Sequence, residues 1–374
     1  MRPVWAEVDL GAVVDNVRAL RAHVAPASLC AVVKADGYGH GAVPVARAAL
    51  AGGATVLAVA LAGEGAALRS AGIDARILVL SQASPDELDD LVAHGLEATV
   101  YTAAGLAGLE RAVAATGTGV PQAVHLKIDT GMHRVGAPPA EAVALAGAIA
   151  AAPGLELRSV FTHFAVADEP DDPFTDTQLE RFRAALAEIE AADIDVGCVH
   201  AANTAGALDH PDARLDLVRC GIGIYGLDPA PALAGRVPLR PAMTLAAQVS
   251  HTKRVAAGEA LSYGLRYRLE REATIATVPM GYADGVPRRL GAVGGTVLIG
   301  GRRRPIAGTV TMDQFLVDCG DDEVAVGDEV VLLGRQGGEA IGAEDWAGAL
   351  DTISYEIVCG VGPRVPRRYR EVPT

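Results

Sequence analysis

The chain has few cysteines, and their spacing lacks the pairs that metal sites and disulfide frameworks need. Its 374 residues include only Cys30, Cys198, Cys220, Cys319 and Cys359, with no C-x-x-C motif. Structural zinc sites and small disulfide-rich folds depend on such paired spacings. We therefore expect reduced thiols, no disulfide bridge and no metal site.

Long apolar runs and an excess of positive charge are also missing. The N-terminal segment has no basic stretch followed by an unbroken apolar core, so we expect a cytoplasmic protein without secretory signal or membrane anchor. The formal net charge of −14 argues against nucleic acid or a membrane surface as the main partner. Hydrophobic residues make up 50% of the chain, which is typical of a folded globular protein.

Short β-branched runs alternate with alanine-rich amphipathic stretches between about residues 28 and 225. This alternation is typical of parallel strands joined by helices. The eight expected strands end at Lys34, Ala60, Ser81, Tyr101, Asp129, His163, Ala201 and Cys220. Ser84 and Glu87 have capping-box spacing at the start of one connecting helix. Eight such units predict an α/β fold with a (β/α)8 TIM barrel at residues 8–235.

The sequence changes character after Leu227. A proline-rich segment is followed by strand-like runs that alternate with turns rich in Gly and Asp. We therefore expect a mostly β C-terminal domain at residues 236–374. The opening run WAEVDL is also strand-like, and the sequence leaves open whether this N-terminal strand, residues 1–7, joins the barrel or the β domain.

Polar side chains gather at the carboxyl ends of the expected barrel strands. They are Lys34, Lys127, Asp129, His163, Asn203 and Arg219. Active sites of (β/α)8 barrels lie at this rim. A lone lysine at a strand end is usually only a solvated charge, so the grouping, and not Lys34 alone, indicates a site.

Gly221, Gly223 and Gly226 have the G-x-G-x-x-G spacing of dinucleotide-binding loops. Pro229 and Pro231 follow closely, so no helix is expected to begin there, and we reject the dinucleotide interpretation. The glycine amides are better placed to bind a single phosphate after the last barrel strand.

A series of sequence blocks resembles the bacterial alanine racemases, fold-type III enzymes that use pyridoxal 5′-phosphate on a barrel followed by a β domain. The blocks are VVKADGYGHG (32–41), HLKIDTGMHR (125–134), FTHFAVADE (161–169), HAANTA (200–205), VRCGIGIYG (218–226), SYG (262–264), GYADG (281–285), MDQ (312–314) and YEI (355–357). They occur in family order over nearly the whole chain, which makes the resemblance specific.

The resemblance implies interconversion of L-alanine and D-alanine by two bases, with D-alanine supplied for peptidoglycan. Lys34 would bind the cofactor covalently and serve as one base, and Tyr263 would be the other. Racemisation removes a proton from one face of the substrate and returns one to the other face, so two groups are needed. Because Tyr263 lies in the second domain, the resemblance implies a homodimer with shared active sites.

Arg219 matches the residue that faces the pyridine nitrogen of the cofactor. A guanidinium cannot accept a hydrogen bond, so that nitrogen would stay unprotonated and the ring would be a weaker electron sink. This disfavours transamination and decarboxylation. His163 resembles a residue that positions Arg219. The phosphate-binding set implied by the family is Tyr38, Asn203, Thr204, Gly221, Ile222 and Tyr355.

The resemblance also assigns residues to substrate binding and to the entrance of the site. Arg134, Met312 and Asp313 match substrate-binding positions, and Lys127 matches a lysine that is often carbamylated in the family. Asp168, Tyr282 and Arg288 match entrance residues. The chain departs from the common pattern at His133, where a small residue is usual, at Thr309, where many members have arginine, and at Thr311, where some have cysteine.

The sequence bears on three alternative functions. A racemase of another small amino acid such as serine stays open, because an apolar pocket rejects one added hydroxyl only by roughly a hundredfold. Decarboxylation of a basic amino acid would need an acidic residue opposite the pyridine nitrogen, where Arg219 stands. A non-catalytic pyridoxal-phosphate carrier would lack the β domain that holds Tyr263.

Overall fold

The computed structural model describes residues 2–117 and 119–370. Contacts within the chain divide it into two units. The barrel unit comprises residues 13–37 and 42–240, and the C-terminal unit comprises the residues up to 12, residues 38–41 and those from 241 onward. No helix in the described part of the chain is long and apolar enough to cross a bilayer.

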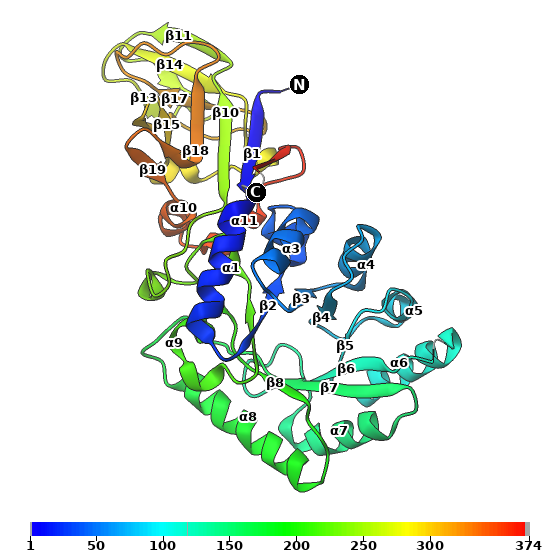
Figure 1. Cartoon of the computed structure of the whole chain (residues 1–374). Coiled ribbons are helices and arrows are strands. Elements are labelled where there is room, and N and C mark those ends of the chain that lie inside the picture. The colour runs from blue at the N-terminus through cyan, green and yellow to red at the C-terminus, as the bar shows by residue number, and fades with distance from the viewer. Residues whose placement is uncertain (1, 118, 371–374) are drawn as a thin grey trace. The chain divides into compact units, whose positions relative to one another are not determined.

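The barrel unit contains eight parallel strands with helices around them (Figure 1). The strands are β2 (Ser28–Val32), β3 (Val56–Val59), β4 (Arg76–Val79), β5 (Ala98–Val100), β6 (Gln122–Lys127), β7 (Leu155–Phe161), β8 (Cys198–His200) and β9 (Leu217–Cys220). All eight lie where the alternating pattern predicts them. Most of their residues are buried, because strands covered by helices on one side and closed on the other form continuous apolar runs.

Backbone hydrogen bonds join the two four-stranded sheets of this unit, β4-β3-β2-β9 and β5-β6-β7-β8, into a closed barrel. The Glu97 amide donates to the Ile77 carbonyl at 2.8 Å, which connects β4 to β5. The Arg219 amide donates to the Ala202 carbonyl at 2.9 Å, which connects β8 to β9. The expected (β/α)8 barrel is therefore confirmed.

One helix, α1, precedes the first barrel strand, and the others lie between successive strands. The helices are α1 (Leu10–Val24), α3 (Ala42–Ala51), α4 (Ala62–Ser70), α5 (Leu88–Ala93), α6 (Ala103–Thr116), α7 (Ala142–Ala151), α8 (Phe174–Ala191) and α9 (Thr204–Asp209). The expected capping box before α5 is present, since the Ser84 amide and hydroxyl both donate to the Glu87 carboxylate. The segment α2 (Lys34–Tyr38) is a left-handed turn and not an ordinary helix.

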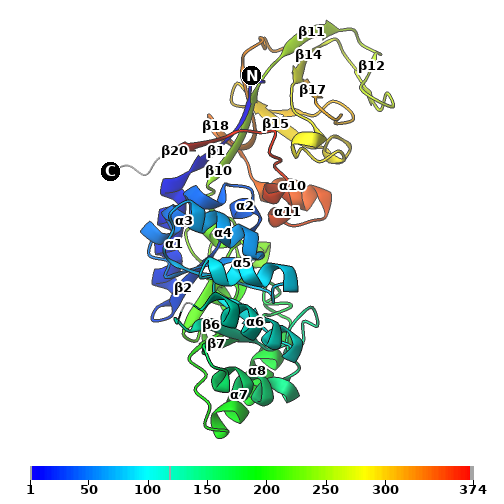
Figure 2. The ribbon, with the colours of Figure 1, turned by 90° about the vertical axis from the view of Figure 1, so that its right-hand side faces the viewer.

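The C-terminal unit is mostly β (Figure 2). Its strands are β1 (Val4–Asp9), β10 (Met243–Gln248), β11 (His251–Val255), β12 (Ala260–Leu261), β13 (Tyr267–Arg268), β14 (Ala273–Val278), β15 (Thr296–Ile299), β16 (Arg302–Pro305), β17 (Phe315–Asp318), β18 (Glu329–Gln336), β19 (Glu339–Ile341) and β20 (Arg367–Arg370). Two short helices, α10 (Ala343–Leu350) and α11 (Ser354–Cys359), follow β19.

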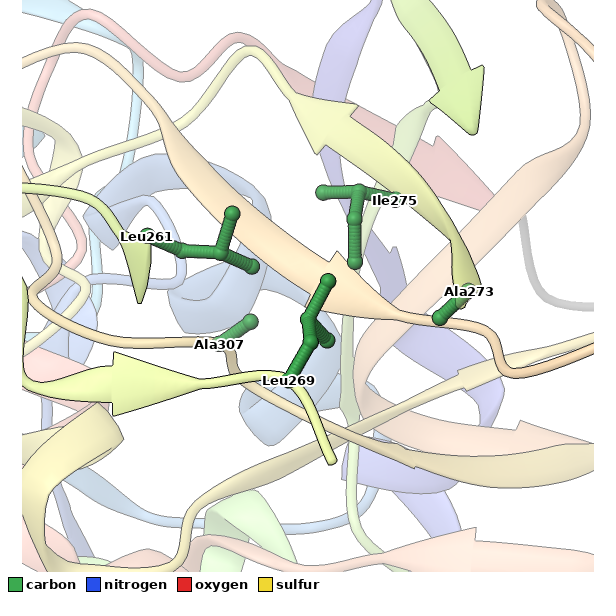
Figure 3. Packing of buried hydrophobic residues seen from close by; sticks show 5 residues of the cluster. All are labelled: Leu261, Leu269, Ala273, Ile275 and Ala307. Atoms are coloured by element: carbon green, nitrogen blue, oxygen red, sulfur yellow. The ribbon is translucent and has the colours of Figure 1, made fainter. Parts of the chain in front are cut away.

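The N-terminal strand belongs to the sheet of the C-terminal unit. β1 pairs antiparallel with β10 and parallel with β20, in the order β16-β15-β18-β10-β1-β20. A separate sheet, β11-β14-β17, packs over a small apolar cluster of Leu261, Leu269, Ala273, Ile275 and Ala307 (Figure 3). This cluster supports the loop that follows β12 and carries Tyr263.

Candidate active site

Lys34 follows β2 and begins a left-handed turn. Residues Ala35–Gly37 all have positive φ, between 51° and 61°. Left-handed backbone costs roughly 1–2 kcal/mol for each residue with a side chain, so such a turn persists only where its surroundings fix it. Glu64 does so, because its carboxylate accepts from the Ala35 amide at 2.7 Å and from the Ala60 amide at 2.9 Å. The turn places Lys34 at the carboxyl end of a buried strand.

Arg219 lies on β9 and is only 4% exposed. Its Nη2 donates to the carbonyls of Thr162, at 2.7 Å, and Ala201, at 2.8 Å. Nη1 lies 2.7 Å from His200 Nδ1, and Nη2 lies 3.1 Å from His163 Nδ1. None of the described residues pairs a carboxylate with this guanidinium. Burial lowers the pKa of Arg219 to about 10, so it stays charged at neutral pH.

The two histidines that contact Arg219 are neutral. Burial, followed by the charge of Arg219, lowers the pKa of both His163 and His200 well below the usual value. A neutral imidazole has one nitrogen that accepts a hydrogen bond. Both rings can therefore accept from Arg219 without adding positive charge to the site.

Lys127 ends β6 and is 6% exposed. Burial, followed by the positive charges of Arg219, Arg134 and Lys34 in that order of size, lowers its pKa to about 8. Its Nζ lies 5.6 Å from the centre of the Phe161 ring. No acceptor among the described residues is within hydrogen-bond distance of this nitrogen. These four cations thus lie near one another at the barrel rim.

Asp129 shapes the turn that carries Arg134. Its Oδ1 accepts from the amides of Gly131 and His133, each at 3.0 Å. The exposed His133 ring lies 3.3 Å from Asp129 Oδ2. The carboxylate therefore serves its own turn, and Arg134 itself is exposed.

Four of the residues matched to phosphate binding, Asn203, Thr204, Gly221 and Ile222, lie in the barrel unit around the start of α9. Asn203 caps this helix, since its side chain accepts from the Gly206 amide at 2.9 Å. Thr204 Oγ1 accepts from the Gly221 amide at 3.0 Å. Ile222 begins a short 3-10 turn, Ile222–Tyr225, so no dinucleotide-type helix begins after these glycines.

The donor set at this rim fits pyridoxal phosphate. Arg219, Lys127, Arg134 and Lys34 supply positive charge, and Asp129 is the carboxylate that acts most strongly on the pKa of Lys127. A cluster of cations this poor in carboxylates is stabilised by an anionic ligand. The cofactor brings a phosphate and a phenolic oxygen, and the Thr204 hydroxyl and the nearby backbone amides are suited to bind a phosphate.

A second group of the residues identified from the sequence lies in the C-terminal unit. Tyr263, Tyr282, Arg288, Met312 and Asp313 line one cavity of about 330 Å³, together with Thr309 and Thr311. The first five of these side chains are open to solvent, with Tyr263 at 74% exposed and Met312 at 52% exposed. Tyr38 and Tyr355 also belong to this unit, and their ring centres are 6.0 Å apart.

A buried carboxylate anchors the loops that line this cavity. Asp284 is completely buried and pairs with both terminal nitrogens of Arg2, at 2.5 and 3.0 Å. Arg364 lies 3.3 Å from Asp284 and 2.6 Å from Asp313, and so links the two. A side chain at Gly281 would lie 2.3 Å from the Thr311 carbonyl, so glycine is required where these loops cross.

Thr309 holds the backbone of Tyr263. Its hydroxyl donates to the Tyr263 carbonyl at 2.9 Å. In return, the Ser262 hydroxyl donates to the Thr309 carbonyl at 2.7 Å. Ser262 has a φ of 61° and Gly264 a φ of 79°, so these bonds fix a left-handed loop that presents the Tyr263 ring.

The structure thus gathers the candidate residues into two groups, one in each unit. Asp168 belongs to neither group: it is exposed in the segment after β7, in the barrel unit, whereas Tyr282 and Arg288 lie in the C-terminal unit. Sequence reasoning missed His200, Glu64 and Asp284 as site residues. His200 could have been found, because it too ends a barrel strand, but nothing local in the sequence identifies the other two.

Comparison with known proteins agrees with this division. The family model described as the alanine racemase N-terminal domain matches residues 8–229, and the one for the alanine racemase C-terminal domain matches residues 242–369. An alanine racemase from Symbiobacterium thermophilum is 51% identical over 370 residues, covering 99% of this chain and 97% of the relative. One from Thermobifida fusca is 48% identical, with 97% of each chain covered.

Solved structures show the same similarity. The crystal structure of alanine racemase from D-cycloserine-producing Streptomyces lavendulae has a TM-score of 0.94 and 43% sequence identity, covering 99% of this chain and 98% of that one. The crystal structure of alanine racemase from E. faecalis has a TM-score of 0.93 and 40% sequence identity, covering 99% of this chain and 98% of that one.

Proposed function

This chain belongs to the alanine racemase family, and we propose that it interconverts L-alanine and D-alanine with pyridoxal 5′-phosphate as its cofactor. The observation that supports this most is the rim of the barrel, where Lys34 lies near three other cations and the buried Arg219 has no carboxylate partner among the described residues. Such a site is suited to bind a ligand that carries several anionic groups. In a bacterium, D-alanine formed in this way would supply peptidoglycan synthesis.

We propose that Lys34 carries the cofactor covalently. Thr204, Asn203, Gly221 and Ile222, with Tyr38 and Tyr355 from the family resemblance, are the candidates for holding its phosphate. When bound, pyridoxal phosphate supplies an electron sink that makes the α proton of an amino acid easier to remove. Arg219 would donate to the ring nitrogen and, being charged, would leave that nitrogen unprotonated.

The chain's own residues would then move the proton. Lys34 Nζ would act on one face of the substrate and Tyr263 Oη on the other, which is the minimum that racemisation needs. Arg134 would bind the substrate carboxylate, together with the backbone of Met312 in a loop steadied by Asp313. His163 and His200 would hold the Arg219 guanidinium by accepting its hydrogen bonds.

We propose that the working enzyme is a homodimer in which Tyr263 serves the partner's site. The cavity around Tyr263 supports this, because Tyr263, Leu265 and Met312 are each more than half exposed. Grouped apolar and aromatic side chains with this exposure usually mark a surface that another protein covers. Tyr282 and Arg288 at the same cavity, and Asp168 from the barrel unit, remain the candidates for the substrate entrance.

Lys127 is a candidate for carbamylation. With a pKa near 8, part of Lys127 is the neutral amine that attacks CO2, forming an N–C bond and releasing one proton. The resulting anion would lie near Arg134 and Arg219 and offset their charge. Loading the protein with 13C-bicarbonate should give a carbamate carbon signal that Lys127→Ala lacks; the same signal in both proteins would exclude Lys127 as its source.

The function is tested by incubating the cofactor-loaded protein with L-alanine in deuterium oxide and separating the enantiomers of the product. We expect D-alanine with deuterium at the α carbon, and no product from Lys34→Ala. L-serine serves as the competing substrate, with an expected preference for alanine of roughly a hundredfold. Unchanged L-alanine after long incubation would contradict the proposal, and faster turnover of serine would favour the alternative substrate.

The attachment site can be tested separately because the chain contains only three lysines, Lys34, Lys127 and Lys253. Borohydride reduction of the loaded protein fixes the cofactor to the lysine that carries it. Peptide mass analysis should then find the added mass on Lys34 alone. Label on Lys127 or Lys253 would contradict the assignment.

A further inference from the structure

A row of hydrogen bonds crosses the interior of the barrel unit from Glu97 to Arg219. Glu97 Oε2 lies 2.9 Å from His125 Nε2, and His125 Nδ1 lies 2.5 Å from Ser159 Oγ. Ser159 Oγ lies 2.9 Å from His200 Nε2, and His200 Nδ1 lies 2.7 Å from Arg219 Nη1. All five side chains are buried. A polar row of this length inside a barrel core is costly unless each member is satisfied.

The strands place these residues progressively closer to the candidate site, from Glu97 to Arg219. Glu97 precedes β5, at the end of the barrel opposite the candidate site. His125 and Ser159 are direct register partners on β6 and β7. His200 ends β8, and Arg219 lies on β9 at the site. The row therefore connects the amino end of one strand to the carboxyl ends of two others.

The direction of the hydrogen bonds follows from Glu97. Burial alone would raise the pKa of its carboxyl group, but hydrogen bonds from His125 and Arg76 outweigh burial and lower the pKa to about 2. An ionised carboxylate only accepts, so His125 Nε2 carries the proton. Burial also lowers the pKa of His125 and keeps the ring neutral, so its Nδ1 accepts from the Ser159 hydroxyl.

The same argument applies to the hydrogen bonds between Ser159 and Arg219. Because Ser159 has given its only proton to His125, its oxygen must accept from His200 Nε2–H. His200 is neutral, so its Nδ1 carries a lone pair, and this lone pair meets an N–H of Arg219. In the other tautomer two N–H groups would face each other at 2.7 Å, and the guanidinium would have to move.

We infer that Glu97 is a positioning residue for Arg219. Through Ser159 it fixes the tautomers of His125 and His200, and the His200 tautomer fixes the position of the Arg219 guanidinium. The part of this inference that concerns the cofactor rests on the proposed function; the part that concerns tautomers does not. A competing explanation is that Glu97 only forms a structural ion pair with Arg76, which contacts it at 2.6 and 3.0 Å. That explanation assigns no role to Ser159.

The first experiment is nitrogen NMR of the cofactor-loaded protein with 15N-labelled histidine. In the wild type, His125 and His200 should both show the neutral tautomer with the proton on Nε2. Glu97→Gln removes the charge with little change of shape, and it should shift part of the His200 population to the other tautomer. Glu156→Gln, which loses a carboxylate on the surface of β7, is the matched control and should leave His200 unchanged.

The second experiment uses Ser159→Ala, which interrupts the row without changing any charge and leaves a small side chain that the core should tolerate. Glu97→Gln alone should lower kcat about tenfold with a smaller change in KM, within the range for mutations along such networks. In the Ser159→Ala background, Glu97→Gln should have no further effect on kcat or on the His200 tautomer.

Two results would overturn the inference. One is a His200 tautomer that is the same in wild type and Glu97→Gln. The other is an equal loss from Glu97→Gln with and without Ser159, as the ion-pair explanation requires. Absence of racemisation in the wild type would instead contradict the proposed function, and the NMR comparison would still test the hydrogen-bond row.

Discussion

The two groups of candidate residues differ in how far each unit completes its own site. Arg219 is 4% exposed and makes four contacts to His200, His163 and two carbonyls. Tyr263 is 74% exposed, and only its backbone is fixed, by Thr309. The barrel unit therefore holds its charged residues through its own contacts, while the C-terminal unit leaves the Tyr263 side chain open to solvent, as the proposed dimer requires.

This difference indicates separate tasks. A group that binds and tunes a cofactor benefits from rigid partners already in place. In the proposed dimer, a base that serves a second chain would need a rigid loop and an open side chain, and Ser262, Thr309 and the buried Asp284 hold the loops around Tyr263. The predictions that follow test whether the two regions divide the work in this way.

The largest effect is expected at Lys34. Lys34→Ala should lower racemisation by roughly four orders of magnitude, since it removes both a base and the cofactor's attachment. It should also abolish the visible absorption of the bound cofactor. Lys253→Ala, at an exposed lysine on β11, is the control and should change neither. Near wild-type activity in Lys34→Ala would remove the barrel rim from the mechanism.

Tyr263→Phe should have the next largest effect, because it removes only the hydroxyl. We expect a loss of roughly a hundredfold to a thousandfold. Solvent-deuterium exchange should be lost mainly with one enantiomer, L-alanine, because the base on the other face is intact. Equal and small losses with both enantiomers would exclude Tyr263 as a base.

Asp284→Asn tests the support behind the exposed region. It leaves the charges of Arg2 and Arg364 without their buried partner, so the free energy of unfolding should fall by roughly 3 kcal/mol or more. Both tryptophans, Trp5 and Trp346, lie in the C-terminal unit, so urea denaturation followed by tryptophan fluorescence reports on this unit. Glu259→Gln, at an exposed turn, is the control. A similar small effect from both would contradict the role of Asp284.

The smallest effect concerns acid stability of the barrel unit. The pKa of Glu97 is lowered in the folded protein from 4.5 to about 2, so its contribution is fully present above pH 4.5 and is lost as the pH falls toward 2. The difference in unfolding free energy between wild type and Glu97→Gln should shrink by at most about 3 kcal/mol over this window. Circular dichroism at the helix band measures it, and a difference independent of pH would contradict the lowered pKa.

The barrel could be predicted from the sequence because each of its strands is a short apolar run between helical segments. The predicted ends overshoot: one strand was expected to reach Asp129 and another His163, whereas β6 ends at Lys127 and β7 at Phe161. Beyond these ends single backbone hydrogen bonds remain, from the Ile128 amide to the Phe161 carbonyl at 2.8 Å and from the Thr162 amide to the His200 carbonyl at 3.2 Å, so the regular pairing stops shortly before the predicted ends. The helices α10 and α11 were not predicted, because their residues lie among strand-like runs.

The candidate residues at strand ends could be predicted from the sequence. The residues that hold them in place could not. Lys34 and Arg219 are found by the rule that barrel sites lie at the carboxyl rim. Glu64, Glu97 and Asp284 act through contacts with residues distant in sequence, and a single sequence holds no signal for such pairs. The pairing of β1 with β20 is non-local for the same reason.

The central claim is that Lys34 of one chain works with Tyr263 of another. Mixing Lys34→Ala protein with Tyr263→Phe protein, after dissociation and reassociation, creates mixed dimers in which one of the two sites has both intact residues. If subunits pair at random, about a quarter of wild-type activity should return, although each variant alone is almost inactive. No recovery, with mixed dimers shown to have formed, would contradict the account.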